Sequence, residues 1–365
     1  MTRYGQLTKK ISMNSLYGAL LNPAFRFGDE RLGASVTATG RQITTHMIET
    51  IGELLTGERH ALEKTSSVDK DGRLVHEYRS ASPAIIYGDT DSCYYKCLGA
   101  TNLEEAIEIA DVAAEGVNSS FPRFMQQAFK CQPGFNELIK AGREVVGTRG
   151  LFQAKKKYMI KVADLEGTRV DKLKSMGSEI KKADTPKIIQ QFLKQTVDMI
   201  LDGRNYEDIC EYVNQQRISV LKNKSNVFLL GVAKQVNNLD KYMAEYENPG
   251  TFRSTSGGKL TIPGHARAAC NYNALLRQFD PGAKTIKSGD KILIYYLKKN
   301  MYGYDALAIP AEMTRFPQWV TDNFSIDVKT TEDRMFDSKL SGIFSALGRE
   351  VPSPQSVLNS SILGF

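Results

Sequence analysis

The stretch "PAIIYGDTDSCYYKC" (83–97) constrains the fold most, because it reads as two strands joined by a short acidic turn. An apolar run leads into Asp89-Thr90-Asp91 and an aromatic run follows it, which is typical of a hairpin. Side chains two residues apart on a strand point the same way, so we expect Asp89 and Asp91 to project together. Two such carboxylates repel each other unless a divalent ion lies between them, and Mg²⁺ prefers these oxygen ligands. Asp-rich turns are also common without a metal, so both interpretations stay open.

A second pattern lies near the N-terminus, in "KKISMNSLYGALLN" (9–22). Steps of four and three residues place Lys10, Asn14 and Tyr17 on one narrow stripe of a helix. A cation, an amide and an aromatic ring on one stripe could hold a nucleotide. An ordinary helix with a solvated face and one buried tyrosine gives the same spacing.

Length and composition indicate a globular protein with two or three domains. Among 365 residues, 41% are hydrophobic, 24% are charged, and the net charge is +7 (48 Lys and Arg against 41 Asp and Glu). Basic residues concentrate in "QAKKKYMIK" (153–161) and "DKLKSMGSEIKK" (171–182), which suits a polyanionic partner or a solvated strand edge. We find no apolar run of about 18 residues and no signal-peptide pattern, so we expect a cytoplasmic protein without a membrane partner.

The five cysteines contain no CxxC pair, and the four histidines are scattered. A zinc site therefore has little support, and reduced, buried thiols are expected.

The periodicity predicts a helix over 33–55 and a surface hairpin or loop over 57–82. Thr101 and Glu104 form an expected capping box for the next helix. From residue 184 the pattern becomes helical: Thr185 is the expected N-cap and Gly203 the stop of one helix, and Asn205 caps the next. Residues 247–260 are expected to form a loop.

Together, "KxxxNSLYG" (10–18) and "YGDTDS" (87–92) resemble the two signature motifs of family B DNA polymerases, the nucleotide-binding fingers helix and the catalytic palm hairpin. Downstream, "KKKY" (155–158), "KLKSMG" (172–177) and "DTPK" (184–187) resemble the family's two DNA-contacting elements and its entry to the thumb. The likeness runs from about residue 6 to 280 and is closest to the replicative polymerases of tailed bacteriophages.

The resemblance implies an α+β fold: a partial antiparallel palm sheet flanked by helices and followed by a mainly helical thumb. The implied domains are the C-terminal fingers helix (1–19), the C-terminal part of the palm (20–185), the thumb (186–345) and a C-terminal tail (346–365).

The resemblance also implies roles for single residues. Lys10 and Asn14 would contact the triphosphate of a dNTP, and Tyr17 would floor the nascent base pair. Asp91 would be the main ligand of two Mg²⁺ ions, with Mn²⁺ as an alternative, and Asp89 would lie beside them. Glu144 would be a third acidic residue near the active site and a further metal ligand. The residues implied to hold primer-template DNA are Lys155, Lys156, Lys157, Tyr158, Lys172 and Lys174. Lys157 stands where the family often has Arg, which keeps the charge but not a bidentate phosphate contact.

Two-metal nucleotidyl transfer in this family also needs an aspartate from a D-x-x-S-L-Y-P strand, and the sequence contains neither that string nor the acidic motifs of a proofreading exonuclease. We expect half of a split polymerase whose partner chain supplies the aspartate and the exonuclease. A truncated polypeptide would show the same residues. A non-catalytic remnant that binds DNA or organises a replisome is the alternative function, although intact Asp91 and Lys10 weigh against it. The tail "SVLNSSILGF" (356–365) resembles a sliding-clamp-binding peptide, and a tail packed against the thumb is equally consistent with it.

Overall fold

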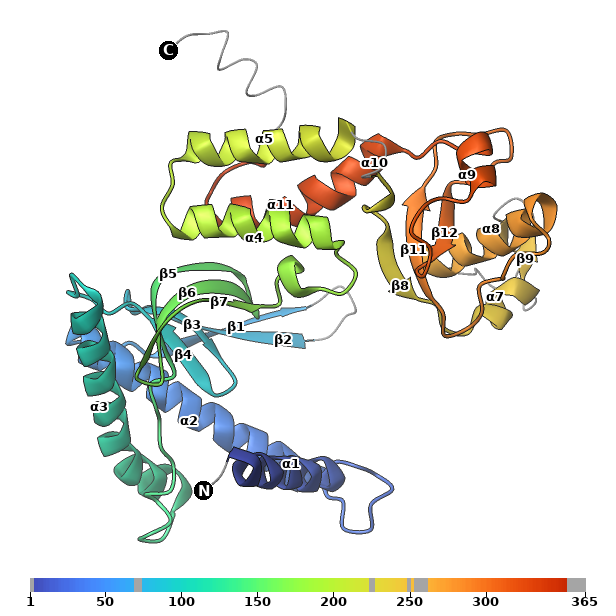
Figure 1. Cartoon of the computed structure of the whole chain (residues 1–365). Coiled ribbons are helices and arrows are strands. Elements are labelled where there is room, and N and C mark those ends of the chain that lie inside the picture. The colour runs from blue at the N-terminus through green and yellow to red at the C-terminus, as the bar shows by residue number, and fades with distance from the viewer. Residues whose placement is uncertain (1–2, 69–73, 223–226, 248–250, 253–261, 353–365) are drawn as a thin grey trace. The chain divides into compact units, whose positions relative to one another are not determined.

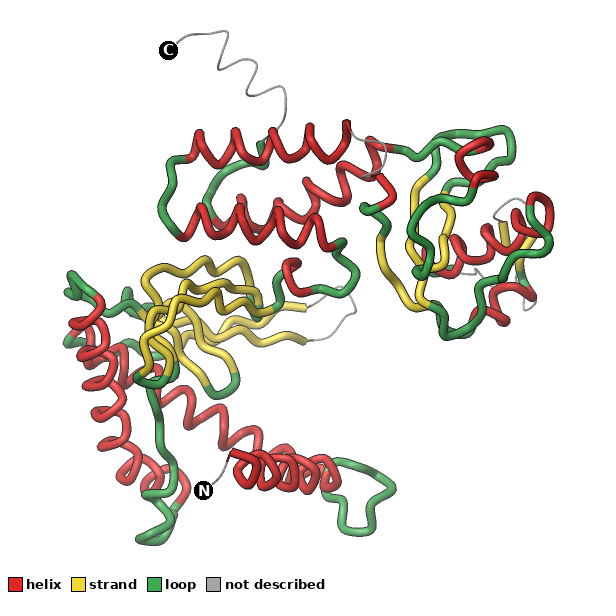
Figure 2. Tube along the Cα trace, in the orientation of Figure 1, coloured by secondary structure: helices red, strands yellow, loops and turns green. Residues whose placement is uncertain are grey.

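The computed structural model describes residues 3–68, 74–222, 227–247, 251–252 and 262–352 (Figure 1). Residues 69–73 of the expected 57–82 hairpin or loop, most of the expected 247–260 loop and the candidate clamp-binding peptide lie outside these residues. The chain forms two compact units, one of Met1–Thr148 with Val162–Asp171 and one of Arg149–Lys161 with Lys172–Phe365. Helices and small antiparallel sheets occur in both (Figure 2), which confirms the predicted α+β class.

The first unit begins with two helices, continues with two hairpins and closes with a long helix. Its elements are α1 (Arg3–Leu20), α2 (Glu30–Thr56), β1 (Leu62–Val68), β2 (Leu74–Ser80), β3 (Ile85–Asp89), β4 (Ser92–Tyr95) and α3 (Leu103–Phe129). Strands β1 and β2 pair antiparallel, as do β3 and β4, so both predicted hairpins are confirmed.

Capping residues set both ends of helix α2. The Asp29 side chain accepts a hydrogen bond from the Arg31 N–H at the N-terminus, and Gly57 ends the helix with φ +76°. Ile51 on its buried face packs against Val117 and Phe121 of α3. This small core holds α2 in a fixed position relative to α3.

The predicted cap of α3 is displaced by one residue. The Asn102 side chain accepts from the Glu105 N–H at 3.0 Å, and the Glu105 carboxylate accepts from the Thr101 N–H at 2.7 Å. Asn102 therefore caps the helix, and Glu105 reaches back as in a capping box, but to the N–H of Thr101, the residue before the cap. The capping residues are thus Asn102 and Glu105 in place of Thr101 and Glu104. Asparagine caps a helix at least as well as threonine, and here Asn102 is the N-cap residue.

A three-stranded antiparallel sheet follows, in the order β5-β6-β7. Its strands are β5 (Val145–Ala154), β6 (Lys157–Leu165) and β7 (Thr168–Met176). At its end in the first unit, the carboxylate of Asp164 is only 1% exposed and pairs with Arg143 and Arg169, while the Gly167 N–H also donates to it. Burial alone would raise the pKa of Asp164, but these hydrogen bonds and charges outweigh burial and lower that pKa. Arg143 also pairs with Asp111 of α3, so the network joins the sheet end to α3.

The second unit contains one helical layer and one mixed layer. The helical layer consists of η1 (Glu179–Lys181), α4 (Lys187–Leu201), α5 (Tyr206–Lys222), α10 (Val328–Glu332), the π-helix η2 (Asp333–Asp337) and α11 (Ser338–Ala346). Its apolar core includes Phe192, Leu193 and Phe336. The predicted stop at Gly203 is confirmed by φ +76°, and the Asn205 cap by its bond from the Asp208 N–H at 2.7 Å. Thr185 does not cap α4, whose N-cap residue is Pro186.

The mixed layer contains strands that were not predicted from the sequence. Its elements are β8 (Val232–Gln235), α7 (Leu239–Ala244), β9 (Tyr246–Glu247), β10 (Thr251–Phe252), α8 (Gly264–Phe279), β11 (Lys291–Tyr296), β12 (Ala306–Pro310) and α9 (Gln318–Asn323). Strands β12, β11 and β8 form an antiparallel sheet, and buried residues of α8 such as Tyr272 and Leu275 share one core with it. The segment predicted as mainly helical is thus helical with a three-stranded sheet inside it.

All five cysteines are free thiols in the structure, but Cys270 alone of the five is buried, so the predicted burial is wrong for the other four. Among the described helices, none combines the length and the apolarity that a membrane span requires.

Candidate active site

The acidic residues lie at a tight two-residue turn between β3 and β4, not along one continuous strand. Asp89 pairs with Ser92 as the last register of the hairpin, which leaves Thr90 and Asp91 as the turn. Thr90 has φ +54°, a left-handed conformation that a β-branched residue rarely adopts. The Asp91 N–H donates to the Asp89 carbonyl at 2.6 Å, and Ser92 Oγ donates to the same oxygen at 3.1 Å. The geometry of the turn, not the alternation of side chains along a strand, therefore sets how the Asp89 and Asp91 side chains lie relative to each other. The expectation that strand alternation makes them project together does not apply here.

Helix α2 supports this turn from outside the hairpin. The hydroxyl of Thr44 donates a 2.7 Å hydrogen bond to the Thr90 carbonyl. One helical turn further on, Ile48 packs so closely over Gly88 that a methyl group there would lie 2.6 Å from Ile48 Cδ1. The sequence motifs gave no signal for Thr44, because nothing local links it to a turn 46 residues away.

The donor atoms at the turn fit a hard cation. The Asp91 side chain is exposed and that of Asp89 is half-buried, so both belong to a surface that a substrate can reach. Carboxylate oxygens with space for substrate phosphates and water are the ligands that Mg²⁺ takes. In the described part of the chain, no three His, Cys, Asp or Glu residues gather into a potential metal site. Glu144 therefore does not complete such a group with Asp89 and Asp91. It is exposed before β5, and its carbonyl accepts from the Glu166 N–H.

A neighbouring cysteine has no nucleophilic character. Cys93 lies on β4 beside the turn, and burial raises the pKa of its thiol to about 12. The thiol stays protonated at neutral pH, so the chemistry of the turn rests on its carboxylates.

Helix α1 carries the other predicted site residues of the first unit. It is a continuous helix over Arg3–Leu20, so Lys10, Asn14 and Tyr17 share a stripe as expected. Lys10 and Asn14 are exposed and Tyr17 is half-buried. All three lie on the helix that precedes α2, the helix which holds the acidic turn.

The basic residues predicted to bind DNA lie in the second unit, at the β5–β6 turn, at the start of β6 and along β7. Lys155 and Lys156 form the β5–β6 turn, in which Lys156 has φ +60°, and Lys157 begins β6 with an exposed side chain. Tyr158 differs from the lysines, because it is 8% exposed and its ring stacks on Phe152 at 5.6 Å. A direct DNA contact by Tyr158 stays a prediction.

Gly177 brings the second basic element against the first. It follows β7, which carries Lys172 and Lys174, and it has φ +59°. A Cβ on Gly177 would lie 2.1 Å from the Lys156 carbonyl oxygen. Only glycine permits this approach, so the structure joins "KLKSMG" to the Lys155–Lys156 turn.

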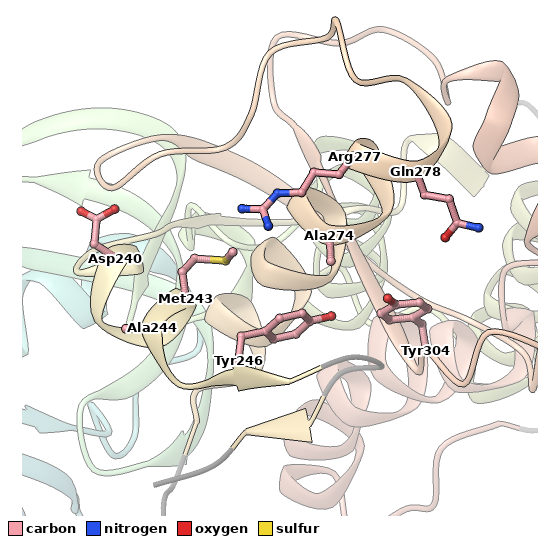
Figure 3. A pocket seen from close by; sticks show the side chains of 8 residues that line it. All are labelled: Asp240, Met243, Ala244, Tyr246, Ala274, Arg277, Gln278 and Tyr304. Atoms are coloured by element: carbon pink, nitrogen blue, oxygen red, sulfur yellow. The ribbon is translucent and has the colours of Figure 1, made fainter. Parts of the chain in front are cut away.

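A hollow of about 650 Å³ lies elsewhere in the second unit, lined from α7, β9, α8 and the segment after β11 (Figure 3). Its lining residues are Asp240, Met243, Ala244, Tyr246, Ala274, Arg277, Gln278 and Tyr304. None of them belongs to a motif discussed above, so this hollow is separate from the candidate site.

Comparison with known proteins gives a consistent result. A family model described as DNA polymerase family B matches residues 2–251. The chain is 26% identical over 371 residues to the DNA-directed DNA polymerase of Escherichia phage RB69, covering 93% of this chain and 37% of that polymerase. It is 26% identical over 377 residues to the DNA-directed DNA polymerase of Enterobacteria phage T4, covering 96% and 38%. The DNA polymerase delta catalytic subunit of Candida albicans is 26% identical over 360 residues, which cover 97% of this chain and 28% of that subunit. The chain thus spans less than two fifths of the length of each of these relatives.

Proposed function

Because the chain belongs to DNA polymerase family B, we propose that it takes part in template-directed DNA synthesis, in which a dNTP is joined to the 3′ end of a primer. The observation that carries this proposal is the Asp89-Thr90-Asp91 turn, which α2 holds through the Thr44 hydrogen bond. The turn lies within the matched residues 2–251, as do α1 and the basic strands.

We assign the metal-binding role chiefly to Asp91. Its exposed carboxylate would hold a divalent ion directly, and Asp89 would assist it, in part through water. Mg²⁺ is the expected ion, and Mn²⁺ accepts the same oxygen ligands. Two such ions, when bound, activate the primer 3′ hydroxyl and neutralise charge on the leaving pyrophosphate.

Helix α1 and the basic strands would position the substrates. Lys10 and Asn14, both exposed, would contact the triphosphate, and the ring of Tyr17 would support the new base pair. Lys155, Lys156 and Lys157 would neutralise phosphates of the primer-template duplex, with Lys172 and Lys174 on the adjoining strand extending the contact.

A second polypeptide segment would complete the site with a further metal-bridging aspartate, carried by a D-x-x-S-L-Y-P strand that this sequence does not contain. We propose that a separate chain supplies it, and with it any proofreading activity. Exposed apolar side chains on α1 support such an association: Leu7, Ile11, Met13 and Leu16 are 53% to 71% exposed. At about 100° per residue Leu7 and Ile11 lie roughly 40° apart on α1, whereas Met13 and Leu16 point to other sides of the helix, so a partner chain that covers α1 would bury apolar side chains on more than one side.

Reconstitution tests the proposal. The chain is mixed with a polypeptide that carries the D-x-x-S-L-Y-P strand, and Mg²⁺-dependent primer extension is measured beside the mass of the complex. We expect a one-to-one heterodimer that extends primers, whereas the isolated chain binds primer-template DNA weakly and extends nothing. Extension by the isolated chain that disappears in Asp91→Asn would refute the shared site. A heterodimer that binds DNA without extending it would support the non-catalytic alternative.

We also propose that residues 356–365, outside the described part of the chain, bind a sliding clamp. Deleting them should lower processivity only when the clamp is present. Equal loss with and without the clamp would contradict this role.

A further inference from the structure

The acidic turn depends on a conformation that its own sequence disfavours. Thr90 occupies φ +54°, and a branched Cβ makes the left-handed region costly for it. Within the hairpin, the Asp91 N–H and Ser92 Oγ both donate to the Asp89 carbonyl. These two bonds hold the Asp89 carbonyl, whereas the Thr90 carbonyl accepts its bond from outside the hairpin.

That second carbonyl is held by α2. Thr44 Oγ1 donates to the Thr90 oxygen at 2.7 Å, and Ile48 and Ile51 continue the same face of the helix at spacings of four and three residues. Ile48 packs over Gly88, and Ile51 belongs to the core with α3. The hydroxyl of Thr44 therefore stands on a helix whose position packing already fixes.

We propose that Thr44 is a positioning residue for catalysis: its hydroxyl fixes the Thr90–Asp91 peptide group and thereby the place at which Asp91 presents its carboxylate. This inference rests on the proposed function. The carbonyl of Thr90 and the N–H of Asp91 belong to one planar peptide group, so a bond to the first restricts the second. The gain from one hydrogen bond is comparable to the cost of the left-handed conformation, so removing the bond releases the turn.

The first measurement needs no catalysis. Amide hydrogen exchange of the full chain is followed by NMR in Thr44→Val, which keeps the shape but lacks the donor, and in Thr44→Ser, which keeps the donor. We expect the Asp91 amide to exchange about fivefold faster in Thr44→Val, the change expected for one lost hydrogen bond, and at the wild-type rate in Thr44→Ser. Thr37→Val is the matched control, because within the described residues the Thr37 hydroxyl bonds to carbonyls of its own helix, at Gly33 and Ala34.

The second measurement uses the chain combined with its complementing polypeptide. The Mg²⁺ concentration for half-maximal single-turnover incorporation should rise about fivefold in Thr44→Val, with the dissociation constant for primer-template DNA unchanged. Unchanged exchange at Asp91 in Thr44→Val, or faster exchange spread evenly along α2, would overturn the proposal. A third outcome separates the two proposals. If exchange in Thr44→Val is faster only at the turn, but the wild-type complex never extends primers, Thr44 positions the turn and the proposed function is rejected.

Discussion

Ile48 of α2 lies directly over Gly88 of β3: a methyl group on Gly88 would come within 2.6 Å of the Ile48 Cδ1 atom. The residue before the acidic turn is therefore a glycine for a packing reason. Its φ is not in the left-handed region, so conformational freedom does not require it. The contact sets how near the β3–β4 hairpin can approach the helix that supports it.

Gly88→Ala should lower the free energy of unfolding by about 1 kcal/mol, because the end of Ile48 must move within a packed site. Combining it with Ile48→Val, which removes Cδ1, should give a smaller loss than the sum of the single changes, by about 0.5 kcal/mol or more. Urea unfolding of the four proteins measures this. Gly40→Ala is the control: apart from its own helix, no atom of the described residues lies within 4 Å of its added methyl group, so it should stabilise α2 by up to about 1 kcal/mol. Strict additivity would show that Ile48 and Gly88 are not in contact.

Replacing Lys155 and Lys156 with alanine should weaken primer-template binding equally for all DNA sequences, because phosphate contacts carry no base information. The slope of log K against log salt concentration should fall by roughly 1–2. Titrations at several salt concentrations measure it. Lys161→Ala provides the comparison, since Lys161 on β6 is engaged with Asp202, and the slope should stay unchanged. A changed sequence preference with an unchanged slope would indicate base contacts instead.

The close approach at Gly177 yields a separate prediction. Gly177→Ala and Gly167→Ala both place a side chain at positive φ, at a cost of about 1–2 kcal/mol each. Only Gly177→Ala also collides with the Lys156 carbonyl, because no atom lies within 4 Å of a methyl group on Gly167. We therefore expect Gly177→Ala to raise the dissociation constant for primer-template DNA, and Gly167→Ala to leave it near the wild-type value. Equal effects would mean that the Lys155–Lys156 turn is not held by this contact.

His46 should make the first unit sensitive to acid. Its ring stacks on Phe124 at 4.1 Å and its Nε2 lies 2.9 Å from Ser120 Oγ, and burial, aided by the charge of Arg59, lowers its pKa from 6.5. Because the unfolded chain binds the proton more tightly, the contribution of His46 is fully present above about pH 6.5 and is lost as the pH falls through the lowered pKa. Urea midpoints measured between pH 7.5 and pH 5 should therefore decline less in His46→Gln than in the wild type. Parallel curves would contradict the assignment.

Much of the first unit was predictable because its signals are local. The hairpin around Asp89 and Asp91 and the helix over Glu30–Thr56 follow from periodicity and flanking turn residues. In the second unit, the Asn205 cap is predictable for the same reason, because it follows from one side chain and the residues after it.

The remaining features depend on contacts that a local pattern does not contain. The Thr44 bond to Thr90 spans 46 residues, and the approach of Gly177 to Lys156 joins the ends of two strands. Strand β8 pairs with β11, in which Lys291 lies opposite Gln235, so four-residue β8 gains its strand character from a distant partner. The left-handed Thr90 could not be foreseen either, because threonine seldom adopts that conformation.

The most direct test of the central claim is single-turnover nucleotide incorporation by Asp91→Asn in complex with the complementing polypeptide, with primer-template binding measured on the same samples. A metal ion supplies several kcal/mol of transition-state stabilisation and each ~1.4 kcal/mol is a factor of ten, so we predict a loss of about 10³-fold in rate with unchanged DNA affinity. Asp89→Asn should lose less, and Asp240→Asn, which alters an aspartate of the hollow in the second unit, should keep the wild-type rate. Incorporation by Asp91→Asn at the wild-type rate would contradict the assignment of the acidic turn as the catalytic metal site.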